Sequence, residues 1–185
     1  MKVAVFGGSF NPLHKGHEAI LRYLTENARF DKVLLVVTPQ NPFKGAASPE
    51  EAEGRFRAAQ DALKRHPEIK AEACDIELRL PPPQYTIRTL DILKERHPED
   101  DFTLITGADC LESFPRWKDY KRILKEYGVA VYPRKGYHRG HLRSRLLKED
   151  PAYKIELLHA PLVTISSTQI REAREKGDDL SKWLM

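Results

Sequence analysis

The chain has 185 residues, of which 41% are hydrophobic and 31% charged, a length that suits one well-buried domain, residues 1–185, and is too short for two full ones. Its 31 basic and 27 acidic residues give a net charge of +4, which fits phosphate-bearing ligands but, with the two signs interleaved, does not indicate a nucleic-acid partner. No apolar run is long enough to span a membrane and the first strand leaves no room for a signal peptide, so we expect a cytoplasmic protein without a membrane partner.

The first half of the chain alternates apolar runs with amphipathic stretches. Strands are predicted at residues 2–6 and 32–37, and a helix between them begins near Gly16, where apolar residues recur at helical spacing. A second helix is predicted from Ser48, as N-cap, to about residue 66, with a proline at its first position. Residues 71–80 predict a further strand, which the prolines at 81–83 end.

The second half repeats this alternation. It predicts a helix from residue 85 or 86 to about 97, strands at 102–106, 129–132 and 155–159, and a last helix capped by residues 166–168 and ending near residue 177. The order predicts an α/β fold: an open, doubly wound, mostly parallel Rossmann-like sheet with helices on both faces. Because ligands bind beyond the carboxyl ends of such strands, the loops that follow them are predicted to form one site.

The segment GGSFNPLHKGH, residues 7–17, joins the first predicted strand to the first helix. Its glycines let backbone N–H groups approach an anion, and the helix presents its positive N-terminal end to the same place. His14 and His17 lie at that end. No Gly-Lys pair precedes Ser or Thr, and the G-x-G-x-x-G spacing of dinucleotide-binding dehydrogenases is absent. The segment therefore predicts a phosphate-binding turn of another type.

A second informative segment, ISSTQIR, occupies residues 165–171. Consecutive hydroxyl residues at a helix start cap the helix and offer further hydrogen-bond donors. Arg171 follows one turn later, where its guanidinium can clamp phosphate oxygens. By itself the segment indicates either an ordinary helix cap or a second phosphate-binding element.

Together the two segments resemble the HxGH and ISSTxIR motifs of the nucleotidyltransferases that share a Rossmann-like fold with class I aminoacyl-tRNA synthetases. The match runs nearly end to end, and it is similar to the bacterial nicotinate-nucleotide adenylyltransferase family. Residues 85–90, YTIRTL, resemble the YTxxTL element of that family, and residues 107–117, GADCLESFPRW, resemble its GxDxLxxFxxW stretch. Arg88 is a departure, because the family often carries Asp there, and it reverses a charge near the substrate loop.

The resemblance implies direct in-line adenylyl transfer from ATP, with Mg²⁺, to nicotinate mononucleotide, giving nicotinate adenine dinucleotide and pyrophosphate in NAD biosynthesis. His14, His17 and Arg171 are expected to be catalytic. An indole face is a good partner for a pyridinium cation, which independently favours Trp117 as a mononucleotide contact. The expected mononucleotide residues are Asn11, Tyr85, Thr86, Trp117 and Arg134. The expected ATP residues are Gly8, Ser9, Phe10, His14, His17, Lys44, Gly107, Asp109, Ile165, Ser166, Ser167, Thr168 and Arg171.

Several alternatives stay open. Pantetheine-phosphate adenylyltransferase shares both phosphate motifs, nicotinamide mononucleotide differs from the nicotinate compound by one group, and a non-catalytic nucleotide-binding regulator would keep the same pocket. The basic residues between 134 and 148 fit a phosphate-facing patch, an oligomer contact or a solvated helix face, and a homo-oligomer is neither indicated nor excluded. The two cysteines, Cys74 and Cys110, join no cluster, so neither a disulfide nor a protein-held metal is expected.

Overall fold

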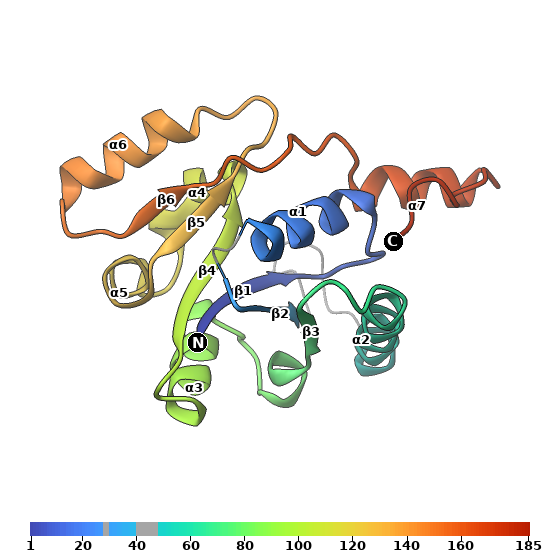
Figure 1. Cartoon of the computed structure of the whole chain (residues 1–185), viewed down its shortest axis with the longest axis horizontal. Helices are drawn as coiled ribbons and strands as arrows, with labels where there is room; N and C mark the ends of the chain where they lie inside the picture. The colour runs from blue at the N-terminus through green and yellow to red at the C-terminus, as the bar shows by residue number, and fades with distance from the viewer. Residues whose placement is uncertain (28–29, 40–47) are drawn as a thin grey trace.

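A computed structural model describes residues 1–27, 30–39 and 48–185. Its centre is a six-stranded sheet in the order β3-β2-β1-β4-β5-β6 (Figure 1), and every strand pairing in it is parallel. The strands are β1 (Lys2–Gly8), β2 (Lys32–Val37), β3 (Ala71–Cys74), β4 (Asp101–Gly107), β5 (Val129–Tyr132) and β6 (Ile155–Leu157). The predicted open, doubly wound α/β fold is confirmed.

The strand order reverses direction between β1 and β4. β1 pairs with β2 on one side, where Val3 lies opposite Lys32, and with β4 on the other, where Val3 lies opposite Phe102. The chain moves outward from this central pair in both directions, so the loops after β1 and β4 diverge and leave a crevice at their carboxyl ends. The fold therefore places the glycine-rich turn and the segment after Gly107 beside each other.

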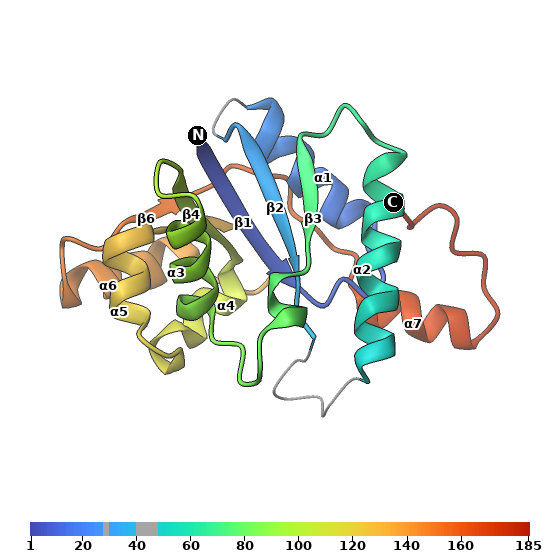
Figure 2. The same cartoon turned by 90° about the horizontal axis from the view of Figure 1, so that it is seen from below.

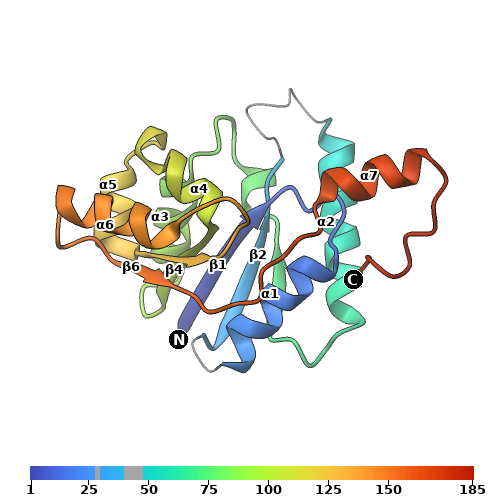
Figure 3. The same ribbon diagram turned by 90° about the horizontal axis from the view of Figure 1, so that it is seen from above.

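Helices cover both faces of the sheet, as Figures 2 and 3 show from opposite sides. On one face, α1 (Lys15–Glu26) and α2 (Pro49–Lys64) pack on alternate strand residues such as Ala4 and Leu35. On the other, α3 (Thr86–Arg96), α4 (Ala108–Ser113) and α6 (Arg139–Glu149) pack on residues such as Val5 and Leu104. Within the described parts of the chain, none of the helices is long and apolar enough to cross a membrane.

Two helix starts have the predicted caps. The Ser48 hydroxyl accepts a hydrogen bond from the Glu51 N–H at 3.2 Å, and Pro49 is the first residue of α2. Ser166 caps α7 (Ser167–Glu175) and accepts from the Gln169 N–H at 3.1 Å. Each cap satisfies a donor that the first helical turn leaves without a partner.

The prediction of a strand over residues 71–80 is wrong beyond Cys74. The chain turns at Asp75 and continues as a short 3₁₀ helix, η1 (Ile76–Arg79), whose Ile76 is buried. The segment after β4 also holds short elements that the sequence pattern did not predict. They are α4, the 3₁₀ turn η2 (Phe114–Arg116), α5 (Tyr120–Arg122) and the π-helical turn η3 (Ile123–Tyr127). Their apolar side chains complete the core on the α3 face.

Candidate active site

His14 and His17 form the cap at the start of α1. The Nδ1 atom of His14 accepts hydrogen bonds from the N–H groups of Gly16, at 3.0 Å, and His17, at 3.4 Å. In return the Nδ1 atom of His17 accepts from the His14 N–H at 3.2 Å. The two rings are stacked, with centroids 3.7 Å apart. The spacing of three residues thus makes a reciprocal capping box from imidazoles instead of the usual hydroxyl and carboxyl groups.

Both imidazoles are neutral at physiological pH. Burial lowers the pKa of His14 to about 4, with a further contribution from the Arg134 charge. Burial also lowers the pKa of His17 well below its usual value, and His14 and Arg134 add to the effect. Because each Nδ1 accepts a hydrogen bond, the single proton of each neutral ring lies on Nε2. Each histidine therefore offers one Nε2–H donor.

Gly16, between the histidines, lies at a point of close approach. A Cβ atom there would fall 2.3 Å from Cγ1 of Val163 and 2.8 Å from Cε1 of His14. These distances are far below the usual 3.5–4.0 Å contact of about van der Waals size. The start of α1 therefore packs tightly against the segment that leads into α7, and only glycine fits.

The two predicted motifs meet in space, although they lie at opposite ends of the chain. A guanidinium nitrogen of Arg171 donates to the Asn11 carbonyl at 2.6 Å, and the Ser167 hydroxyl donates to the Pro12 carbonyl at 3.2 Å. Figure 3 shows the start of α7 next to the loop that precedes α1. Two helix N-termini therefore converge on one place, where their dipoles favour an anion.

A cavity of about 180 Å³ lies where these elements converge. Its polar lining comes from four places in the sequence: the first turn, the loop after β4, the loop after β5 and the start of α7. The Arg134 side chain lies 3.8 Å from the Asp109 carboxylate at its rim. The lining residues are His14, Gly16, His17, Ile20, Asp109, Tyr132, Arg134, Val163, Ile165, Ser166 and Ser167.

Several predicted ATP residues lie outside that lining. The Phe10 ring is buried and sits over Gly8, where a Cβ atom would lie 3.1 Å from it, so only the Phe10 backbone is open to a ligand. Gly107 is packed against Asp109, with its would-be Cβ 2.5 Å from the carboxylate. Thr168 accepts a hydrogen bond from Arg171 at 3.2 Å. Lys44 lies outside the described residues.

The predicted mononucleotide residues other than Asn11 and Arg134 lie in a separate group on the α3 face. Tyr85 precedes α3 and Thr86 is its first residue. The Lys118 ammonium lies 6.0 Å from the centroid of the Tyr85 ring, which brings the Trp117 segment beside the start of α3. Trp117 is half-buried and stacks on Phe114, with centroids 4.6 Å apart and planes at 27°. These residues do not line the 180 Å³ cavity.

A buried polar pair lies behind the start of α3. The Thr89 hydroxyl donates to Glu77 at 2.9 Å, and burial raises the pKa of the Glu77 carboxyl to about 7. Arg88, the departure from the family pattern, donates to the Pro81 carbonyl at 3.1 Å. Its charge is thus directed at the proline-rich loop, which it joins to α3.

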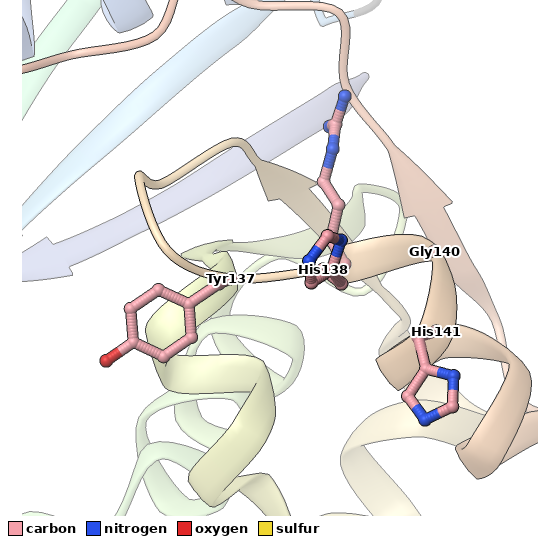
Figure 4. Close-up of a pocket in the computed structure, with 5 residues that line it drawn as sticks. Tyr137, His138, Gly140 and His141 are labelled. Atoms are coloured by element: carbon pink, nitrogen blue, oxygen red, sulfur yellow. The ribbon is translucent and has the colours of Figure 1, made fainter.

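A larger hollow, about 670 Å³, lies at the start of α6 and is lined by residues 137–141. Figure 4 shows Tyr137 and His141 pointing to opposite sides of it, so its polar groups do not converge. Arg139 donates to the Val131 and Leu158 carbonyls, and Arg143 donates to Ile155, so both hold the sheet edge. Of the basic residues between 134 and 148, Arg134 is the one that lines the smaller cavity.

Sequence reasoning missed Tyr132 and Val163 as lining residues. Tyr132 ends β5 and packs edge-on against Phe6, with centroids 5.9 Å apart. Its position at the carboxyl end of a strand was a usable signal. Val163 carries no such signal, because its role depends on a contact with Gly16, far away in the sequence.

The cytidylyltransferase-like family model matches residues 5–173 of the chain. The match spans the glycine-rich turn, both histidines and the ISSTQIR segment. The fold, the convergent anion-binding site and this match define the chain as a nucleotidyltransferase.

Two curated relatives and one solved structure narrow the class. A Bacteroides fragilis protein named "Probable nicotinate-nucleotide adenylyltransferase" is 39% identical over 183 residues, which cover 99% of this chain and 87% of the relative. A Flavobacterium johnsoniae protein of the same name is 36% identical over 184 residues, which cover 100% of this chain and 92% of the relative. The structure titled "Plasmodium falciparum nicotinic acid mononucleotide adenylyltransferase complexed with NaAD" has the same fold, with a TM-score of 0.77 at 20% identity over 99% of this chain and 90% of its own. The chain belongs to the nicotinate-nucleotide adenylyltransferase family, as its sequence resemblance predicted.

Proposed function

We propose that the chain transfers the adenylyl group of ATP to nicotinate mononucleotide, releasing pyrophosphate and forming nicotinate adenine dinucleotide. The observation that carries the proposal is the cavity in which His14, His17 and the start of α7 converge. The titles of the relatives and of the Plasmodium structure name the same substrate and product. The activity of those proteins supports the same chemistry here.

The reaction is an in-line displacement at the α-phosphorus of ATP. An oxygen of the mononucleotide 5′-phosphate forms the new bond to that phosphorus, and the bond to the bridging oxygen of the β-phosphate breaks. The electron pair leaves with pyrophosphate. Because the attacking phosphate is already an anion, no general base is required, and catalysis depends on positioning and on stabilising charge that develops on oxygens.

The residues of the cavity supply donors for that charge. The Nε2–H groups of His14 and His17 donate to the α-phosphate oxygens without needing a proton from solvent. The N-terminal amides and hydroxyls of α7, at Ser167 and Thr168, hold the pyrophosphate end, and Arg171 adds a charged donor. In the free protein Arg171 is hydrogen-bonded to Asn11, so a modest rotation of its side chain brings it to the triphosphate. Lys44 is assigned to the same end.

A divalent metal ion generally accompanies ATP in this class of enzyme, and we assign Mg²⁺ to this role. The described residues contain no cluster of three or more histidine, cysteine or carboxylate groups that would hold a metal by themselves. Asp109 places one carboxylate in the cavity. This donor set fits Mg²⁺, which is usually held by substrate phosphates, water and one or two carboxylates. When bound, the ion neutralises phosphate charge.

The start of α3 favours the acid over the amide as the acceptor. Among the described residues no side chain caps this helix, whose first residue is Thr86. Uncapped N–H groups and the positive end of the dipole stabilise a carboxylate more than a neutral amide. The pyridinium ring then lies near Trp117, whose indole attracts a cation.

The test is pyrophosphate release from ATP with nicotinate mononucleotide, nicotinamide mononucleotide and phosphopantetheine as separate acceptors. We expect the highest kcat/KM with nicotinate mononucleotide. A preference for phosphopantetheine would refute the assignment of the acceptor. Tight ATP binding without release of pyrophosphate for any acceptor would instead support a non-catalytic nucleotide-binding regulator.

A further inference from the structure

Arg55 connects two loops of the site from a helix that takes no part in it. It lies on the first half of α2 and is half-buried. One guanidinium nitrogen donates to the Ser9 carbonyl at 2.7 Å and to the Thr38 carbonyl at 2.9 Å, and the other donates to the Pro39 carbonyl at 3.1 Å. These acceptors are main-chain oxygens of the loops that follow β1 and β2.

The bridge continues the sheet beyond its last backbone bond. The Thr38 N–H donates to the Gly8 carbonyl at 2.9 Å, one step past the end of the β1–β2 pairing. From that point the two loops separate, and the next carbonyls lose their partners across the sheet. A planar guanidinium can donate to several carbonyls at fixed angles, which the single point charge of a lysine cannot reproduce. Arg55 thus holds the loops together where the sheet ends.

The residue after Ser9 has a strained backbone. Phe10 has φ of 47°, in the left-handed region that side chains other than glycine rarely adopt. Such a residue costs of the order of a kilocalorie or more and persists only where its surroundings determine its conformation. On one side its ring is buried against Phe6, with centroids 5.4 Å apart. On the other side the preceding carbonyl is fixed by Arg55.

The strained residue also contacts a histidine of the site. The Phe10 ring packs edge-on against the His17 ring, with centroids 5.1 Å apart. We propose that Arg55 is a positioning residue for the phosphate-binding turn, which fixes Ser9 and, through the left-handed backbone of Phe10, the ring of His17. The inference rests on the proposed function for its kinetic effect, but its effect on His17 can be measured without turnover.

The experiment compares Arg55→Ala and Arg55→Lys with Arg57→Ala, an exposed arginine on the same helix. For each variant kcat and KM for ATP are measured, together with the melting temperature and the ¹⁵N–¹H imidazole resonances of His14 and His17. We expect Arg55→Ala to lower kcat about 100-fold, as for a displacement of roughly 1 Å in a catalytic group, and to shift the His17 resonances. Arg57→Ala changes neither. Guanidinium ion at low millimolar concentration partly restores kcat in Arg55→Ala, and Arg55→Lys keeps the fold but recovers little of the loss.

The proposal is overturned if Arg55→Ala keeps the wild-type kcat and His17 resonances, or if its kcat falls only in proportion to the unfolded fraction. It is also overturned if lysine replaces arginine fully. Should Arg55→Ala fail to fold, the same readouts on Arg55→Lys decide. If the wild-type chain releases pyrophosphate with no acceptor, the proposed function fails, while the His17 resonances still test the role of Arg55.

Discussion

Replacing Gly16 by alanine tests the tightest contact of the site. The added Cβ would lie 2.3 Å from Val163 Cγ1 and 2.8 Å from His14 Cε1, so the neighbours must move by about 1 Å to reach a normal carbon–carbon separation. Overpacking of this kind costs about 1–3 kcal/mol. Alanine recovers about 0.5–1 kcal/mol of it, because it loses less backbone entropy than glycine in a helix. We expect a net loss of roughly 1–2 kcal/mol in the free energy of unfolding.

Gly140 provides the matched control. It is the second residue of α6, as Gly16 is of α1, but nothing lies within 4 Å of its would-be Cβ. At about 2–4 °C per kcal/mol for a chain of this size, Gly140→Ala should raise the melting temperature by a few degrees and Gly16→Ala should lower it by several. The shift of His14 should also reduce kcat by about 100-fold in Gly16→Ala alone.

The double variant Gly16→Ala/Val163→Ala separates the two contacts. It removes the 2.3 Å clash but leaves the one with His14 at 2.8 Å, so the two substitutions should couple favourably in stability while kcat stays low. Calorimetry and the pyrophosphate-release assay give both readouts. The reasoning is refuted if Gly16→Ala is as stable as Gly140→Ala, or if the double variant recovers kcat together with stability.

Three further predictions concern individual side chains of the site. His17→Ala should lower kcat by about 100- to 1000-fold, the usual effect of losing one donor to the transition state, with an unchanged melting profile by circular dichroism; wild-type turnover would remove His17 from the mechanism. Trp117→Ala should raise KM for the mononucleotide about 2- to 30-fold, the range of a cation–aromatic contact, and change KM for ATP less; equal effects would contradict stacking. Since burial lowers the pKa of His14 to about 4, the unfolded chain binds more protons below pH 6.5, so the free energy of unfolding should fall as pH drops from 7 towards 4. His14→Asn keeps a capping oxygen without a titrating group, and urea titrations should give it a shallower slope than the wild type; equal slopes would contradict the shift.

Most of the fold could be predicted because its signals are local. Ser48 and Ser166 cap helices through bonds to residues only three positions away, so their patterns are visible in a short window. The strand predicted over 71–80 failed for the same reason. Its apolar residues continue past Cys74, but the turn at Asp75 places Ile76 in the core by tertiary packing. Elements of three to six residues, such as α4 and α5, carry too little periodicity to be detected.

The site divides along the same line. The two phosphate motifs could be identified because each is a contiguous segment at a helix start. The contacts that join them, between Arg171 and Asn11 or between Gly16 and Val163, span more than 140 residues and depend on the completed fold. Arg55 and Arg143 look alike in the sequence, as single cations on amphipathic helices. Their acceptors are main-chain carbonyls, and carbonyls carry no side-chain pattern from which a partner could be predicted.

The reciprocal cap explains why imidazoles, and not longer cations, occupy the two positions. An ammonium group at position 14 would have no lone pair with which to accept from the Gly16 N–H, so the helix start would lose its cap. An imidazole accepts at Nδ1 and donates at Nε2, and the cap itself determines which nitrogen carries the proton. Protonating either Nδ1 would break one half of the box and place a charge within 3.7 Å of the other ring. The arrangement therefore keeps both donors neutral and fixed, so the attraction of the site for a triphosphate comes from Arg134, Arg171 and the two helix ends, while the histidines supply directed hydrogen bonds to the reacting phosphate.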